Sequence, residues 1–222
     1  MTPSVDPDTG LPLADFLKAK TWSLHTEAEK TGVVSDIVHQ RVLLNDYLNY
    51  IQNLREIYET LESETRWLGH YDEVGEFFTS SLFRSTHLKH DYENLRSRQP
   101  PMPSTGLHPV TRSYCEHILQ AQKQRPAAML AHIYVRYLGD LNGGLIMQRL
   151  LKSSLNLTED CLTFYAFPDI EDIAEFRSNF RDTLNRVVLT EVERHAVSKA
   201  AMETFSFNIV LSAKCRSKIS YN

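Results

Sequence analysis

The sequence has few cysteines and no long apolar run. Its three cysteines, Cys115, Cys161 and Cys215, are far apart and form no CxxC pair, so we expect neither a disulfide framework nor a structural zinc site. No apolar run approaches the roughly 18 residues that a membrane span needs. The N-terminus also lacks the basic and apolar stretches of a signal peptide. These absences predict a soluble, cytoplasmic protein of a reducing compartment.

Positive charge is also scarce. The chain has 24 Lys and Arg residues against 28 Asp and Glu residues, a formal net charge of −4, which argues against a general affinity for nucleic acid or anionic membranes. Any anion that binds therefore needs a local cluster of bases. With 222 residues, of which 42% are hydrophobic and 23% charged, the chain has the composition of a globular protein with one core.

Apolar residues recur at the helical spacing of three and four along most of the chain. A first helix begins near Leu13 with Gly32 as its stop, and a longer helix covers LLNDYLNYIQNLREIYETLESETRWL. Further helices are expected at 74–83, 87–96, 109–124, 126–154, 170–187 and 190–214. The prolines of RQPPMPSTGLHP interrupt this pattern. The sequence predicts an all-α bundle with an arm at 1–12, one domain at 13–215 and a polar tail at 216–222.

Three of the eight glycines fall within one otherwise helical stretch, HIYVRYLGDLNGGLIMQRL. Each glycine costs a helix interior about 0.5–1 kcal/mol relative to alanine, so a compensating contact is expected. Steps of three and four place the following residues on one helix face: His132, Arg136, Gly139, Asp140, Gly143 and Met147. The bare face allows either the close crossing of a second helix or a flat ligand resting on the backbone beside Asp140. Spacing alone leaves both interpretations open.

The stretch YVRYLGDLNGG is similar to the distal-helix signature of the haem oxygenases. The similarity extends over most of the chain, through LHTEAE, FPDI, FRSNFRDTLN and TFSFNI. The resemblance implies that the 126–154 helix kinks over a haem, with Gly139 and Gly143 against the porphyrin face. It also implies that Asp140 organises water beside the oxygen bound to the iron. The resemblance therefore favours the ligand interpretation.

His25 in SLHTEAEKTG matches the family's proximal ligand, the axial ligand of the haem iron. Judged alone, a histidine beside an apolar stripe is more typical of a structural or surface residue, and eight other histidines compete with it. The resemblance to the haem oxygenases instead favours His25 as the iron ligand. Glu29 follows one turn later and is the candidate partner that orients the imidazole, directly or through water.

The two carboxylates of haem require a set of bases in this acidic protein. Arg177 and Arg181 lie one turn apart on the predicted 170–187 helix, and Lys18 lies two turns before His25. By resemblance these three bases match positions that pair with the haem propionates. For each base taken alone, a solvated surface charge is the alternative.

The resemblance assigns further positions to the haem pocket: Tyr134, Phe205, Phe207 and Asn208. It also places Tyr134 and Arg136 with Asp140 in the catalytic group. Aromatic residues at such spacing are otherwise typical of a core.

The resemblance implies that haem b is both substrate and cofactor. O2 and electrons from an external reductase or ferredoxin, such as a flavin reductase, open its ring to biliverdin, with IXα as the default isomer, and release CO and Fe²⁺. We expect a monomer that supplies a downstream bilin-using protein.

Two other functions are weighed against this one. The first is a haem carrier or sensor without turnover, which release of CO would exclude. The second is a di-metal oxidase, which needs inward carboxylates and a Glu-x-x-His pair, whereas the nearest match here is Asp36-x-x-His39.

Overall fold

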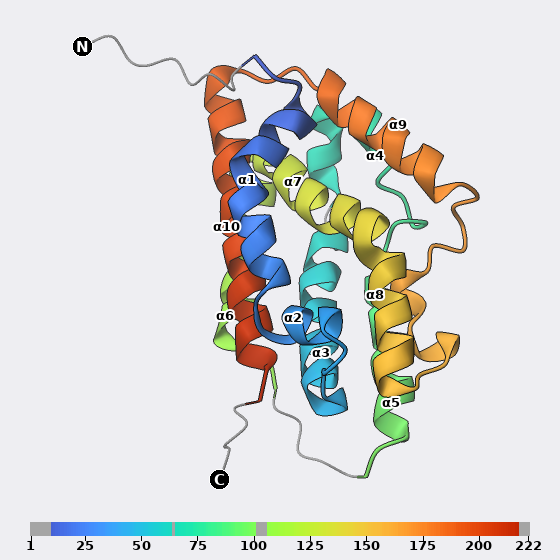
Figure 1. The fold of residues 1–222 in the computed structure, drawn as a ribbon. Coiled ribbons are helices and arrows are strands. Elements are labelled where there is room, and N and C mark those ends of the chain that lie inside the picture. Colours follow the sequence, from blue (N-terminus) through green and yellow to red (C-terminus); the bar gives the residue numbers. More distant parts are fainter. Residues whose placement is uncertain (1–9, 64, 101–105, 218–222) are drawn as a thin grey trace.

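The computed structural model describes residues 10–63, 65–100 and 106–217. Within these ranges the chain forms helices and no strand (Figure 1). The all-α prediction is thereby confirmed. Parts of the predicted arm, proline-rich loop and tail lie outside the described residues, at 1–9, 101–105 and 218–222.

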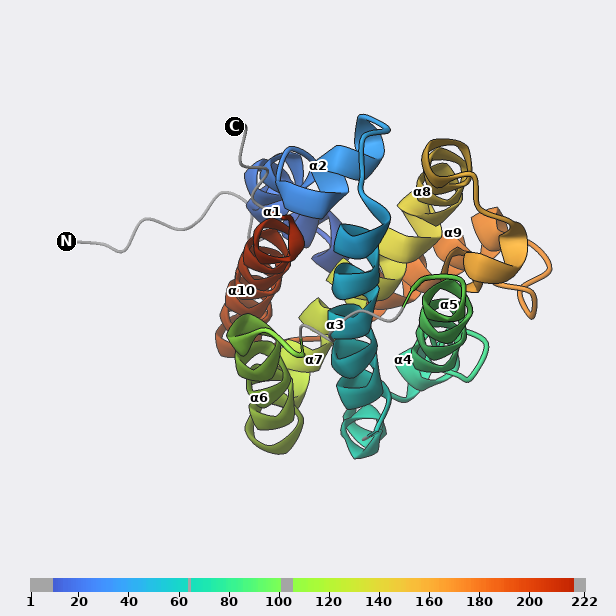
Figure 2. The same ribbon diagram turned by 90° about the horizontal axis from the view of Figure 1, so that it is seen from below.

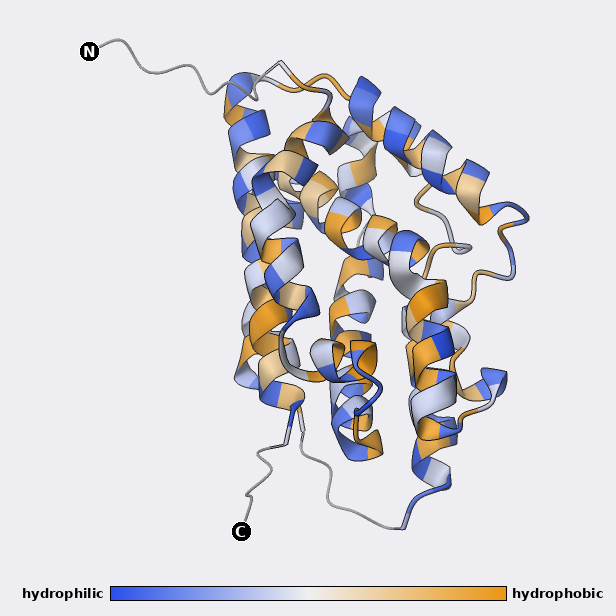
Figure 3. Ribbon diagram, viewed as in Figure 1, coloured by the Kyte–Doolittle hydropathy of each residue, from blue (hydrophilic) through white to orange (hydrophobic). Residues whose placement is uncertain are grey.

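The helices follow one another in this order: α1 (Leu13–Glu29), α2 (Gly32–Val38), α3 (Leu44–Glu62), α4 (Asp72–Gly75), α5 (Ser85–Ser97), α6 (Pro109–Gln124), α7 (Pro126–Ile133), α8 (Gly139–Leu155), α9 (Ile173–Arg186) and α10 (Glu191–Cys215). A π-helical segment, Tyr134–Leu138, joins α7 to α8. The predicted helix at 109–124 is confirmed as α6, and those at 170–187 and 190–214 are confirmed as α9 and α10 with small shifts at their ends. Hydrophilic and hydrophobic residues alternate along these helices (Figure 3), as expected where each buries one face.

The prediction that Gly32 stops the first helix is wrong, because α1 ends at Glu29 and Gly32 opens α2. Gly32 has a φ of +57°, and a Cβ there would lie 2.1 Å from the carbonyl oxygen of Ser212 on α10. The left-handed backbone and this close approach together require glycine. The sequence did not reveal α2, since its 7 residues are too few for a helical period to stand out.

The segment between α3 and α5 also differs from prediction. The long second helix ends at Glu62, and a 3₁₀ turn around the buried Trp67 follows it. Of the predicted helix at 74–83, only the start is helical, and the rest consists of turns. Phe78 and Leu82 are nevertheless buried, so their spacing reflects burial rather than a helical period.

α3 runs between the other helices and contributes a large part of the core (Figure 2). α10 packs against α1 and α7, and α6 packs against α3 and α7. α2 and α9 each pack against both α1 and α8, whereas α1 and α8 make at most slight direct contact. We call the region flanked by α1 and α8 the α1–α8 interval. In Figure 1 its upper end lies at α9 and its lower end at α2.

No helix in the described part of the chain combines the length and apolar character needed to cross a membrane. The three cysteines are unpaired in this structure.

Candidate active site

The three clustered glycines face different surroundings. A Cβ added at Gly144 would lie 3.5 Å from the carbonyl oxygen of Tyr165, so this glycine packs against protein. A Cβ added at Gly139 or Gly143 would meet no atom within 4 Å. Close packing therefore accounts for Gly144 alone. At Gly139 and Gly143 the helix backbone is uncovered, which leaves room for a flat ligand.

The helix that carries these glycines changes direction just before them. α7 runs obliquely across the molecule in Figure 1, and α8 turns downward from its end. The π-helical segment Tyr134–Leu138 forms the junction, and such segments occur often at functional sites. The helix predicted at 126–154 is thus confirmed as a continuous helical run over 126–155, with the π-helical segment inside it and just before the glycines.

A chain of polar contacts, only partly exposed to solvent, connects Asp140 to two other helices. The Tyr58 hydroxyl on α3 donates to Oδ2 of Asp140, and Nε of Arg136 donates to the same hydroxyl oxygen at 3.1 Å. Nη1 of Arg136 donates to Oδ1 of Asn208 on α10, also at 3.1 Å. The Arg136 guanidinium lies 4.8 Å from the centroid of the Tyr58 ring. These contacts fix Asp140 relative to α3 and α10.

Burial and neighbouring charges shift the pKa values of Asp140 and Arg136 in opposite directions. Burial raises the pKa of Asp140, while Arg136 and the hydrogen bond from Tyr58 lower it. Burial also raises the pKa of Tyr58 well above its ordinary value, so its hydroxyl stays protonated and remains a donor. Burial disfavours the charged form of Arg136, but Tyr58 and Asp140 outweigh that effect and raise its pKa. An anchored carboxyl group with a raised pKa is suited to proton transfer.

The role of Tyr58 was not predictable from the sequence. Its position fits the apolar stripe of α3, and spacing carries no information about its hydroxyl group. The one available signal is general, because a buried tyrosine hydroxyl usually needs a hydrogen-bond partner.

The exposed face of α1 carries His25 and Glu29. Nδ1 of His25 lies 3.7 Å from Oε1 of Glu29, and their side chains are 49% and 59% exposed. Phe205 on α10 meets the imidazole edge-on, with a centroid separation of 6.0 Å. Because Nδ1 faces Glu29, Nε2 is the nitrogen that remains for an iron ion.

The predicted bases lie where α9 packs on α1. Arg181 pairs with Asp15 of α1, and both side chains are partly exposed. Burial raises the pKa of Tyr134 to about 12, with Arg181 lowering it and Asp15 raising it, so Tyr134 lies near the same pair. Arg177 is one turn before Arg181 on α9, and Lys18 is one turn after Asp15 on α1. The structure thus places Tyr134 and the predicted bases on adjoining turns of these two helices and the π-helical segment.

His132 and Phe207 pack against neighbouring helices of the bundle. His132 is fully buried, and its Nδ1 lies 2.9 Å from Oγ1 of Thr204. Phe207 stacks on Tyr114 of α6, with centroids 4.9 Å apart and ring planes 12° apart. The prediction that His132 shares the open face is therefore wrong. Phe207 packs on α6, and its place in the haem pocket stays a prediction.

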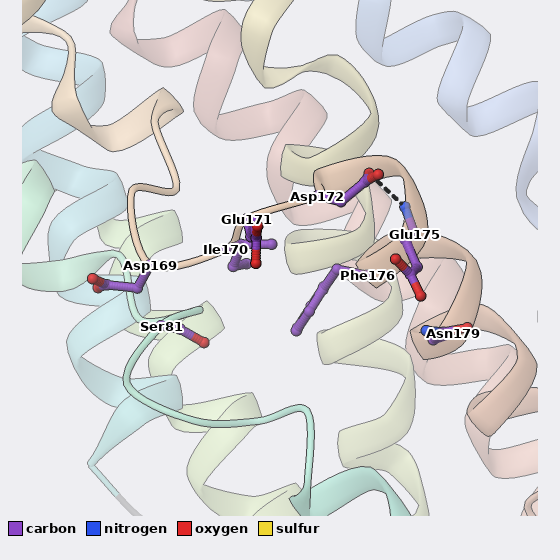
Figure 4. A pocket seen from close by; sticks show the side chains of 8 residues that line it. All are labelled: Ser81, Asp169, Ile170, Glu171, Asp172, Glu175, Phe176 and Asn179. Carbon is purple, nitrogen blue, oxygen red and sulfur yellow. Dashed lines mark hydrogen bonds between the residues drawn. The ribbon is translucent and has the colours of Figure 1, made fainter.

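A separate hollow of about 600 Å³ lies beside α9 (Figure 4). Its charged lining residues are all acidic: Asp169, Glu171, Asp172 and Glu175. The carboxylate of Asp172 caps α9 by accepting from the backbone amides of Ala174 and Glu175. This lining disfavours an anionic ligand, so it does not suit a haem propionate.

The di-metal alternative finds no support in the described residues, which contain no group of three or more His, Cys, Asp or Glu side chains able to hold a metal ion. In the Asp36-x-x-His39 motif, Asp36 pairs with Arg41 and Arg216, each at 2.7 Å. Its carboxylate is thus already occupied by two guanidinium groups.

A half-exposed imidazole on one helix and uncovered backbone on another, within an all-α bundle, is an arrangement suited to a helical haem protein. Comparison with known proteins agrees. The family model described as "Heme oxygenase" matches residues 11–214. This chain belongs to the haem oxygenase family, and the enzyme class expected from the sequence is confirmed.

Relatives and solved structures match nearly the whole chain. A heme oxygenase of Takifugu rubripes is 33% identical over 200 residues, which cover 89% of this chain and 72% of that protein. The structure of heme oxygenase from Leptospira interrogans matches with a TM-score of 0.83 and 25% identity, covering 92% of this chain and 100% of that one. Heme oxygenase-2 from Synechocystis sp. PCC 6803, solved with heme and NO, matches with a TM-score of 0.79 and 25% identity, covering 92% and 85%.

Proposed function

We propose that this protein binds haem b in the α1–α8 interval and opens its ring to biliverdin, with release of CO and Fe²⁺. The observation that carries this proposal is the uncovered backbone at Gly139 and Gly143, next to a carboxyl group anchored from inside the core. Haem supplies both the iron and the ring that is oxidised. The protein therefore has to bind the ring, orient it, and control water and protons.

On the α1 side, Nε2 of His25 would hold the haem iron. Glu29 orients the imidazole through Nδ1, from its present distance of 3.7 Å or through a water. The edge contact from Phe205 limits rotation of the His25 imidazole ring. Held by this neutral imidazole, the haem iron would supply the site at which O2 binds.

The propionates are held by Lys18, Arg177 and Arg181. Arg181 already has a carboxylate partner in Asp15, so a propionate joins or replaces that pair when haem binds. Tyr134 adjoins this set. These bases fix the rotation of the haem in its plane and so determine which meso carbon is attacked, for which we propose the IXα outcome.

On the α8 side, Asp140 holds a water and passes a proton through it. Tyr58 donates to Oδ2, which leaves Oδ1 for that water. Arg136 holds the Tyr58 hydroxyl, and Asn208 holds Arg136, so the carboxylate stays in place as the proton moves. Gly139 and Gly143 let the haem lie close enough for the water to reach its oxygen-binding side.

The relative solved with heme and NO contains a diatomic ligand together with heme. We propose that haem and O2 bind together in this chain in the same way. The electrons come from a ferredoxin or a flavin reductase, a monomer is sufficient for the site, and the bilin passes to a bilin-using protein.

Turnover by the full chain tests the proposal. Haem is titrated into the purified protein, and the complex is then supplied with O2 and ascorbate or a ferredoxin system. We expect an equimolar complex with a Soret band, followed by biliverdin IXα on chromatography and by CO. A stable complex that yields neither product indicates a haem carrier or sensor. Absence of an equimolar complex contradicts the proposal altogether.

A further inference from the structure

The two tryptophans of the chain have opposite environments. Trp67 is 2% exposed and belongs to the core, whereas Trp22 on α1 is 59% exposed. An indole is a large apolar group, and leaving most of it in water gains little for folding. The surroundings of Trp22 indicate what it contacts instead.

Trp22 is stacked on the imidazole of His25. Their ring planes are parallel, at 0°, and their centroids are 5.9 Å apart, which is an offset-stacked pair. Phe205 meets the same imidazole at 67°, and Glu29 lies beside Nδ1. The orientation of the imidazole plane is therefore set from three directions, and Trp22 supplies the contact from the preceding turn.

Trp22 also contacts the first of the predicted bases. Nζ of Lys18 lies 6.0 Å from the centroid of the indole ring, at the outer limit of a cation–π contact. Steps of four, three and four along α1 place Lys18, Trp22, His25 and Glu29 on one helix face. The indole thus lies between the group assigned to a propionate and the group assigned to the iron.

We propose that Trp22 is a haem-binding residue, which covers the ring between the iron and the propionate edge and fixes the plane of the His25 imidazole. This inference rests on the proposed function, since it requires haem on the exposed face of α1. Haem would bury indole surface that is now in water, and this adds apolar contact to the ionic grip of the bases. The indole would also keep the imidazole from rotating once Nε2 is bound.

Haem release from the full chain tests this role. The Trp22→Ala and Trp22→Phe variants are loaded with haem, and transfer of haem to an excess of apomyoglobin is timed. Loss of an aromatic pair corresponds to a change of about 2- to 10-fold, so we expect Trp22→Ala to release haem faster by that factor. Trp22→Phe should lie between Trp22→Ala and the unaltered protein. Leu119→Ala, which removes an exposed apolar side chain on α6, is the matched control and should leave the rate unchanged.

A second readout reports the imidazole plane directly. The electron paramagnetic resonance spectrum of the low-spin ferric cyanide complex depends on that plane, and Trp22→Ala should shift or broaden it. An unchanged release rate and spectrum in Trp22→Ala, with the equimolar complex intact, would overturn this inference and leave the proposed function standing. An unaltered protein that forms no complex would contradict the proposed function before any variant is compared. Slower turnover with a protein electron donor, at an unchanged release rate, would instead assign Trp22 to donor docking and overturn its role at the haem.

Discussion

The two sides of the α1–α8 interval are built differently. On the α8 side, Asp140 is held by Tyr58, and Arg136, which is 7% exposed, holds Tyr58 in turn. On the α1 side, the His25 side chain is 49% exposed. The groups proposed to control a proton are thus arranged by the core before any ligand arrives. The groups proposed to grip the ligand lie in water, and their contacts are completed by binding.

The largest effect is expected from removing the iron ligand on the exposed side. His25→Ala should change the ferric optical spectrum and abolish turnover, because it removes the imidazole proposed to hold the iron. Added imidazole should restore part of the activity, since a free imidazole molecule can then take the place of the missing side chain. His195→Ala removes an exposed histidine from α10 and serves as the control. An unchanged ferric spectrum in His25→Ala would exclude His25 as the ligand.

Variants on the α8 side should behave in the opposite way: they should still bind haem but lose catalytic activity. Asp140→Ala should form the haem complex but make biliverdin about 100-fold more slowly, the typical loss when a positioned proton donor is removed. Single-turnover chromatography of biliverdin checks this. Tyr58→Phe keeps the carboxylate but removes its anchor, and it should give a smaller loss. A normal biliverdin yield from Asp140→Ala would refute the role of Asp140.

Much of the helical framework was predictable, because buried faces impose a period on the sequence. α6 followed from such a stripe over 109–124. The position of His132 was not predictable in the same way. His132 shares a face with Gly139 only if the helix is regular, and the π-helical segment Tyr134–Leu138 changes the register between them. The hydrogen bond between Tyr58 and Asp140 joins residues 82 positions apart, a distance over which spacing carries no information.

Low pH should lower the free energy of unfolding through His132, which is buried on α7. Burial lowers the pKa of His132 to about 3, from an ordinary value of 6.5. Between these values the unfolded chain binds a proton that the folded chain does not. The free energy of unfolding should therefore fall as pH drops from 6.5 towards 3, by up to about 1.4 kcal/mol per pH unit from this group.

Urea unfolding at several pH values measures that slope. His132→Phe should have a shallower slope than the unaltered protein, whatever its stability at neutral pH. His195→Ala should keep the original slope, because that side chain is exposed. Equal slopes in His132→Phe and the unaltered protein would contradict the buried, neutral state of His132.

The smallest effect is expected from a single base on the exposed side. Arg181→Ala should raise the dissociation constant for haem about 2- to 5-fold, since its side chain is 48% exposed and ion pairs in water are weak. Spectrophotometric titration measures the constant, and product chromatography shows whether the isomer changes. Asp15→Asn removes the competing carboxylate and should tighten binding slightly. Weaker binding in Asp15→Asn would show that this carboxylate supports the base rather than competing with the propionate.

The most direct test of a haem lying on bare backbone is Gly143→Leu. The new side chain meets no protein atom at its Cβ, so the haem-free protein should become more stable by about 0.5–1 kcal/mol through helix propensity. The same side chain would occupy the space assigned to the porphyrin, and crowding of this kind should weaken haem binding about tenfold. Gly144→Ala, which faces Tyr165, should leave haem binding unchanged. Unweakened haem binding by Gly143→Leu would contradict the placement of haem against α8.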